Sequence, residues 1–262
     1  MTNFKRNPAT MLYGAIIKPH VDPPAGLGCA IDTSTHPRWD KSWSNYIYGR
    51  DWFGLKILPA GRLPYYPFLQ GNIGDAGLFW CKDALEYESP SPYYIIFGSA
   101  NGIYFSYTTL WRRHSVRGVR DITEAEESHI DGAKYLSDYV DGSGNRYDGT
   151  KIGNQVWTTK NLHATHYQNG SDITGGFVQV HPHDVIEGIN SEAEMVEYYG
   201  RLYRWETTND DNLINNNGYL VPSKSDWEIL LDYLEDEYSE IEDIWHKGMV
   251  LKSCRQVDHP LA

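Results

Sequence analysis

Helical signals are concentrated in the second half of this sequence, which limits what the remaining chain can form. The segment from Ser191 to Glu194 has the S-x-x-E pattern, in which the Ser and Glu side chains satisfy each other's free amides, and Gly200 is placed to end the helix. The segment from Ser225 to Glu228 repeats the pattern. Apolar residues behind it recur at helical spacing and predict a buried face: Trp227, Leu230, Leu231 and Leu234. Acidic residues between them predict a solvated outer face: Asp232, Glu235, Asp236 and Glu237.

Residues 29–121 have a different pattern. Short runs of Tyr, Ile and Phe at 93–97 and 103–107 are bounded by Gly, Pro and Ser, which predicts strands joined by long loops. Residues 1–28 contain four prolines and are expected to form an extended lead-in. Residues 122–140 are acidic and are expected to connect the two halves, with a helix there left open. A chain of 262 residues with both kinds of element predicts one or two α+β domains.

Charge and hydropathy exclude several classes of partner. The formal net charge is −12 and there is no basic run, so we expect no nucleic-acid binding. No stretch approaches 18 consecutive apolar residues, so we expect no membrane insertion. The first residues lack an apolar run after Lys5 and Arg6, so we expect no secretory signal. That expectation favours a particle assembled in the cytoplasm over an ordinary secreted lectin.

Several motifs together resemble one known family. The second half contains DGSGNRY at 141–147, KIGNQVW at 151–157, KNL at 160–162, YGRLYRW at 199–205, VPSKSDWE at 221–228 and LKSC at 251–254. The first half contains FGLKILPAGR at 53–62, GLFW at 77–80 and SVRGVRD at 115–121. Together they resemble the Fibrobacter succinogenes major paralogous domain, a branch of the C-type-lectin-like fold, with its two halves in exchanged order.

The resemblance implies a fold and a division of the chain. We expect an α+β C-type-lectin-like fold with antiparallel sheets, two helices and long loops. Residues 29–121 would be the C-terminal half of that domain and 141–262 the N-terminal half, joined by the acidic connector at 122–140. The halves would reunite within one chain, as in a circular permutation, or between subunits by swapping. In the usual order Cys254 and Cys29 would lie about a dozen residues apart, so we expect them to be close in space.

The resemblance also implies a function. Related domains serve as variable receptor-binding tips on phage tail fibres and on cell surfaces, with the variable positions in the segment that corresponds to residues 65–111 here. Aromatic residues mixed with Ser are how binding surfaces are often built. We therefore predict these ligand-binding residues: Tyr65, Tyr66, Phe68, Tyr93, Tyr94, Tyr104, Ser106, Tyr107 and Trp111. Strand alternation would put Tyr104 and Ser106 on one face and Tyr107 on the other, and part of the set should be core.

The expected role is a non-enzymatic recognition protein at a virion surface or outside the cell. Its partners would be a host cell-surface glycan or protein and other virion proteins, and it would form a homo-oligomer, with a trimer favoured. The alternatives are a cell-surface adhesin, or a structural connector whose aromatics only fill cores and subunit interfaces. No nucleophile-and-base motif is present, so no enzymatic activity and no cofactor are expected.

Two metal sites were weighed and neither is predicted. The segment from Asp141 to Asn145 resembles a calcium loop but lacks the later bidentate acid, so it is interpreted as a tight turn entering a strand. Four histidines could supply zinc ligands, which would open a hydrolase alternative, but no cysteine lies near them: His163, His166, His181 and His183. Cys81 is expected to be a small buried residue.

Overall fold

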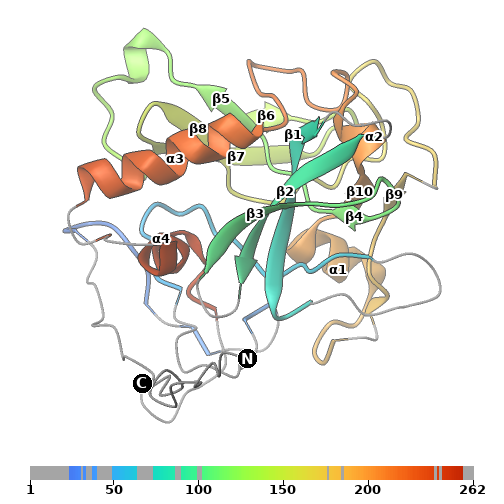
Figure 1. Ribbon diagram of the computed structural model, residues 1–262, viewed down its shortest axis with the longest axis horizontal. Coiled ribbons are helices and arrows are strands. Elements are labelled where there is room, and N and C mark those ends of the chain that lie inside the picture. The colour runs from blue at the N-terminus through green and yellow to red at the C-terminus, as the bar shows by residue number, and fades with distance from the viewer. Residues whose placement is uncertain are drawn as a thin grey trace, which may run out of the picture.

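A computed structural model gives a mixed α+β architecture of antiparallel sheets and helices (Figure 1). It describes residues 24–30, 32–33, 37–39, 49–63, 73–85, 90–98, 102–175, 177–183, 186–238, 241 and 244–255. The expected lead-in at 1–28 therefore falls mostly outside the described residues. Among those described, the strands form three antiparallel sheets, and no helix is long and apolar enough to cross a membrane.

The first sheet separates the two larger hydrophobic cores. It consists of β1 (Ala76–Leu85), β2 (Ser91–Gly98) and β3 (Ile103–Tyr107), in the order β1-β2-β3, so both predicted strand runs are confirmed. Side chains alternate across a strand, and here both faces are covered. The first core lies on one face and includes Leu55, Phe79, Ile95, Phe97, Trp157, Trp227, Leu230 and Val250. The second core lies on the other and includes Leu78, Trp80, Ile96, Tyr139, Tyr147, Val156, Tyr203 and Tyr219.

The second sheet has the order β5-β8-β7-β6. Its strands are β5 (Val119–Asp121), β8 (Gln155–Thr158), β7 (Arg146–Ile152) and β6 (Lys134–Val140). The connector at 122–140 is therefore not helical as a whole. It contains a short 3-10 turn, η2 (Glu124–Glu126), and then strand β6, which pairs with β7. Glu126 and Asp138 of this connector both bind the Arg120 guanidinium, at 2.7 and 2.8 Å, which ties the connector to β5.

The third sheet is short and joins the two halves of the chain. It consists of β4 (Arg113–His114), β10 (Leu202–Arg204) and β9 (Val178–Gln179), in the order β4-β10-β9, and helix α2 (Trp205–Thr208) follows β10. The indole Nε1 of Trp80 donates a 2.7 Å hydrogen bond to the Tyr203 carbonyl, which fixes this sheet to β1.

The two predicted helices are confirmed, with one correction at a terminus. Helix α1 (Glu192–Tyr199) is capped by Ser191, whose side chain accepts from the Glu194 amide, and Gly200 ends it at φ 73°. Helix α3 (Lys224–Glu237) is capped by Ser223 and not by Ser225. Two overlapping patterns compete here, and the helix begins at the earlier serine, directly after Pro222, with Asp226 closing the capping box.

The two faces of α3 are as predicted. Its apolar residues Trp227, Leu230, Leu231 and Leu234 are buried in the first core, and its acidic residues are exposed. Helix α4 (Ile244–Leu251) was not predicted from the sequence, and it adds Met249, Val250 and Leu251 to the same core.

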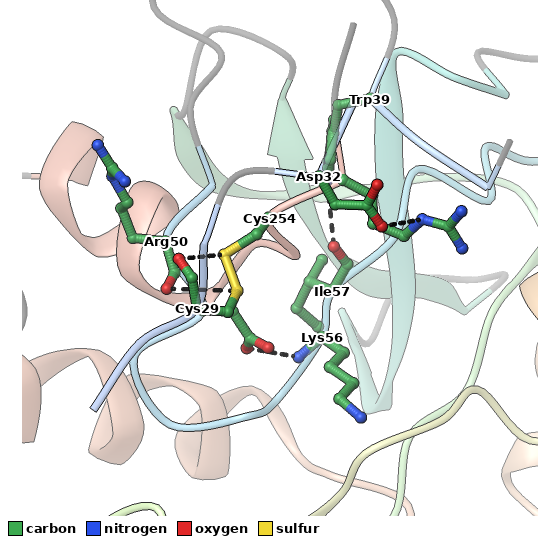
Figure 2. Close-up of a disulfide and its surroundings, with 9 residues drawn as sticks. Cys29, Asp32, Trp39, Arg50, Lys56, Ile57 and Cys254 are labelled. Atoms are coloured by element: carbon green, nitrogen blue, oxygen red, sulfur yellow. Dashed lines mark hydrogen bonds and ion pairs between the residues drawn. A yellow bond between two sulfur atoms is a disulfide. The ribbon is translucent and has the colours of Figure 1, made fainter. Parts of the chain in front are cut away.

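Segments from the first and the second half of the sequence lie side by side in the structure. Residues near the N-terminus run beside the end of α4: the amide of Trp52 donates to the Val250 carbonyl at 2.8 Å, and that of Ser253 donates to Ile57 at 2.9 Å. A disulfide joins Cys29 and Cys254, with their Cα atoms 6.2 Å apart, so the predicted proximity is confirmed (Figure 2). Cys81 is free and buried, also as predicted.

Candidate binding surface at the outer strand of the first sheet

Three of the predicted binding residues are exposed at or just after β3, the outer strand of the first sheet. The side chains of Tyr104, Tyr107 and Trp111 are 54%, 59% and 57% exposed. Exposure of this size is unusual here, because most of the large aromatics described are buried in the two cores. The rings of Tyr104 and Tyr107 are therefore available to a partner.

The sheet register explains how Tyr104 is held in this position. Leu78, Ile96 and Tyr104 lie in one row across β1, β2 and β3, on the face of the second core. The first two are buried, and the third stands where the core ends. Its neighbour Phe105 points to the opposite face and packs against the first core, so the alternation predicted for β3 is confirmed. Tyr104 is therefore anchored on a rigid strand.

The other predicted residues have different surroundings. Tyr94 is buried and stacks on the His114 ring, with centroids 4.7 Å apart. Tyr93 is partly buried against the first core, beneath the Lys224 ammonium. Ser106 is half-buried and pairs with Tyr94 across the sheet. Tyr94 thus supports the surface from behind. Three further predicted residues lie outside the described residues: Tyr65, Tyr66 and Phe68.

Four arginines surround these aromatics, and the sequence analysis did not single them out. Leu63 and Arg113 exchange backbone hydrogen bonds of 3.1 and 3.3 Å, which brings Arg62 and Arg112 to the same place from distant parts of the chain. Arg204 pairs with Arg113 across the third sheet. The segment Trp111-Arg112-Arg113 was the only hint of this cluster in the sequence. Two adjacent arginines in a chain of net charge −12 are too few to predict a basic site.

Arg62 and Arg112 form one pair, on the side of Tyr104. Burial and the charge of Arg112 lower the pKa of Arg62, whereas the nearby Tyr94 side chain raises it. Burial, with the charges of Arg62 and Arg112, also holds the pKa of His114 well below its usual range. His114 is consequently neutral, so the positive charge at this place belongs to the two guanidinium groups.

Arg204 and Arg113 form the second pair, on the side of Trp111. The Arg204 guanidinium lies 5.5 Å from the Trp111 ring centroid and 5.1 Å from that of Phe177. Burial and Arg204 lower the pKa of Arg113, and Glu206 acts in the opposite direction. A cation over the faces of two rings fixes their positions, so Trp111 is held although its surface is open.

The turn considered for calcium is closed by its own hydrogen bonds. The Asp141 carboxylate accepts from the backbone amides of Ser143 and Asn145, at 2.9 and 3.0 Å, and from the Tyr147 hydroxyl at 2.7 Å. The chain then enters β7, so the interpretation as a tight turn before a strand is confirmed.

The histidines weighed for zinc have separate environments. His181 Nε2 bonds the Ala60 carbonyl at 2.9 Å, and His166 Nε2 lies 3.0 Å from Asp172. The His163 ring packs on Tyr147, with centroids 5.1 Å apart. Within the described part of the chain, no three His, Cys, Asp or Glu side chains are grouped so that they could hold a metal ion.

A cleft elsewhere on the molecule is polar, and its charged groups mostly pair with one another. This cleft of about 460 Å³ lies between the turn at 141–145, the segment 163–165 and α1. Its two carboxylates already have cationic neighbours, since Glu197 pairs with Lys160 and Glu192 lies 3.7 Å from Arg201. The aromatic surface at β3 is therefore the stronger candidate.

Comparison with known proteins identifies part of the chain. Residues 150–255 match the Fibrobacter succinogenes major domain. This match confirms the resemblance for the second-half motifs that lie within these residues, from KIGNQVW at 151–157 to LKSC at 251–254. The matched residues hold β8, α1, β10, α3 and α4, whereas Tyr104, Tyr107 and Trp111 precede them. Searches of curated proteins and of solved structures gave no match.

Proposed function

We propose that this protein is a non-enzymatic recognition module that binds a receptor or glycan on a host cell surface through the exposed aromatics at β3. One observation carries the proposal: Tyr104, Tyr107 and Trp111 are each more than half exposed although the sheet beside them is buried on both faces. Large, stiff side chains on a rigid support lose little entropy on binding, which is why recognition surfaces use them.

We further propose that the fold is C-type-lectin-like and that its halves are in exchanged order. The family match covers the proposed N-terminal half, and the motif SVRGVRD, assigned to the end of the usual domain, forms β5 beside β8. The disulfide between Cys29 and Cys254 supports the same view, because it joins the two positions between which the exchanged order would have been cut.

The proposed setting is a phage fibre or virion decoration protein, assembled as a homo-oligomer together with other virion proteins. Disulfides persist in oxidising surroundings, so the pair Cys29–Cys254 supports a place outside the cytoplasm for the mature protein. A cell-surface adhesin with the same binding surface is the alternative setting.

The proposal is tested by binding the labelled protein to a panel of bacterial strains. We expect strain-selective binding by the wild type, and its loss in the double variant Tyr104→Ala/Trp111→Ala. The matched control is Tyr198→Ala, which removes a 39% exposed tyrosine from α1, and it should bind as the wild type does. Equal binding by the double variant and the control would place recognition elsewhere on the molecule.

A structural connector is the second candidate, and one observation favours it. Ile130 and Leu136, both in the segment 122–140, are 77% and 79% exposed, and an interface with a neighbouring subunit at this place would bury both. Light scattering measures the oligomeric state of the wild type and of Ile130→Ser/Leu136→Ser, and so separates the connector role from the recognition role. If the oligomer dissociates in this variant and the wild type binds no strain, the role of a structural connector protein is favoured over recognition.

A further inference from the structure

Three buried cations of this protein have carboxylate partners, which the pair Arg62 and Arg112 lacks among the described residues. Arg120 binds Glu126 and Asp138, and two lysines are also paired, Lys151 with Asp131 and Lys247 with Glu235. Within the described residues neither Arg62 nor Arg112 forms an ion pair, although both are half-buried and each repels the other. Two guanidinium groups at one place without a carboxylate form a site for an anion from outside the chain.

The protein holds this pair in place from two directions. The backbone bonds between Leu63 and Arg113 fix the main chain next to both arginines. The Arg62 side chain also lies near Tyr94, which is itself buried and stacked on His114. A long side chain normally loses conformational freedom when it binds, and a guanidinium that is already fixed loses less. The site is therefore organised before any ligand arrives.

An exposed aromatic ring lies beside the two charges. Tyr104 stands at the end of the row Leu78–Ile96–Tyr104, on the same face of β3 as Ser106, which pairs with Tyr94. The charge of Tyr104 is among the influences that raise the pKa of Arg62. A sugar ring packs its apolar face on an aromatic ring, and an acidic substituent of that sugar would reach the guanidinium groups. The overall charge of −12 would repel a polyanion elsewhere, so binding would be confined to this place.

We propose that Arg62, Arg112 and Tyr104 form a subsite for an anionic carbohydrate, whose carboxylate or sulfate group binds between the two guanidinium groups. The proposal rests on the proposed recognition function and names the ligand class of that surface. Arg provides paired donors that match the planar geometry of a carboxylate, so the two arginines orient the sugar while Tyr104 packs against it.

The test measures binding of the full chain to three immobilised polysaccharides: polygalacturonate, which carries carboxylates, dextran sulfate, which carries sulfates, and neutral dextran. We expect binding to one or both of the acidic polymers and none to dextran. Arg112→Gln and Tyr104→Ala should each weaken binding at least about 10-fold, in line with the loss of one charge-assisted contact. Binding should also weaken with added salt.

The matched control is Arg146→Gln, which removes the same charge from an exposed position on β7. It should change affinity less than about 2-fold, since screened charges far from a site contribute little. Equal losses in Arg112→Gln and Arg146→Gln would mean unspecific charge attraction and would overturn the proposal. Arg62→Gln also changes the surroundings of the buried Tyr94, so its thermal unfolding is recorded beside its binding.

Failure of this subsite and failure of the recognition function give different results. If the wild type binds bacterial strains through Tyr104 and Trp111 but binds no acidic polymer, the ligand class is wrong and the recognition function stands. If it binds neither strains nor polymers, both proposals fail.

Discussion

The Nε atom of Arg117 donates a 2.7 Å hydrogen bond to Oδ1 of Asn161, and this bond joins the two halves of the chain in the interior. Arg117 lies in the SVRGVRD motif and Asn161 in KNL. The same guanidinium donates to the carbonyls of Leu55 and Thr158, at 3.0 Å and 2.5 Å. Burial lowers the pKa of Arg117 to about 9, although the charge of Asp51 acts to raise it. One buried side chain thus connects three separate segments.

Replacing Arg117 should therefore be costly. Arg117→Met fills much of the same volume but leaves the Leu55 and Thr158 carbonyls and the Asn161 amide without their donor. We expect a loss of about 3–5 kcal/mol in the free energy of unfolding, measured in urea. The control Arg146→Met, at an exposed position, should change it by less than about 0.5 kcal/mol. A loss below about 1 kcal/mol in Arg117→Met would show that the interior closes without this residue.

The disulfide should stabilise the chain because it closes a very long loop. Cys29 and Cys254 are 225 residues apart, so the bond removes much conformational freedom from the unfolded state. We expect Cys29→Ser/Cys254→Ser to lose about 2–5 kcal/mol of unfolding free energy. Dithiothreitol should lower the stability of the wild type to that of the variant and leave the variant unchanged. A variant as stable as the wild type would contradict this.

The helices were predictable because their signals are local. Ser191 and Gly200 bound α1 within ten residues of sequence, and the apolar spacing from Trp227 to Leu234 gives the buried face of α3 directly. The error at the start of α3 has a local cause as well. Ser223 and Ser225 both begin an S-x-x-acid pattern, and only the three-dimensional course after Pro222 decides between them.

The arginine pair was not predictable, because it depends on contacts between distant segments. Arg62 and Arg112 are brought together by the bond between Leu63 and Arg113, which no periodicity in the sequence indicates. The same holds for exposure. Tyr94 and Tyr104 look equivalent in the sequence, but Tyr94 lies in the middle strand and Tyr104 in the outer one. Strand order, which the sequence does not contain locally, decides which ring is free to bind.

The turn at 141–145 should not tolerate a side chain at its first glycine. A Cβ atom on Gly142 would lie 2.1 Å from the Tyr167 carbonyl oxygen, and backbone on both sides prevents an easy shift. We expect Gly142→Ala to lose about 1–3 kcal/mol of unfolding free energy. Gly144→Asn is the control, because nothing lies within 4 Å of its Cβ position and Asn tolerates the φ of +83°. Equal effects in the two variants would mean that the close approach to Tyr167 is relieved by local movement.

Stability should fall in mild acid because of His181. Its side chain is buried, its Nε2 donates to the Ala60 carbonyl, and burial lowers the pKa of His181 to about 4, below the ordinary value of 6.5. Between these two pH values the unfolded chain binds the proton and the folded chain does not. The contribution of neutral His181 is therefore complete above pH 6.5 and is lost as the pH falls toward 4, by about 3 kcal/mol in total.

The measurement compares urea unfolding of the wild type and of His181→Gln from pH 8 to pH 4. Gln can donate the same hydrogen bond to Ala60 but does not titrate, so the stability difference between the two proteins isolates His181. Asp51 has the opposite sign, because burial raises the pKa of Asp51 to about 6 and its contribution is lost as the pH rises through that value. Both proteins contain Asp51, so it cancels in the difference. A difference that stays constant from pH 8 to pH 4 would mean that His181 is protonated without cost, and hence that its site is open to water at low pH.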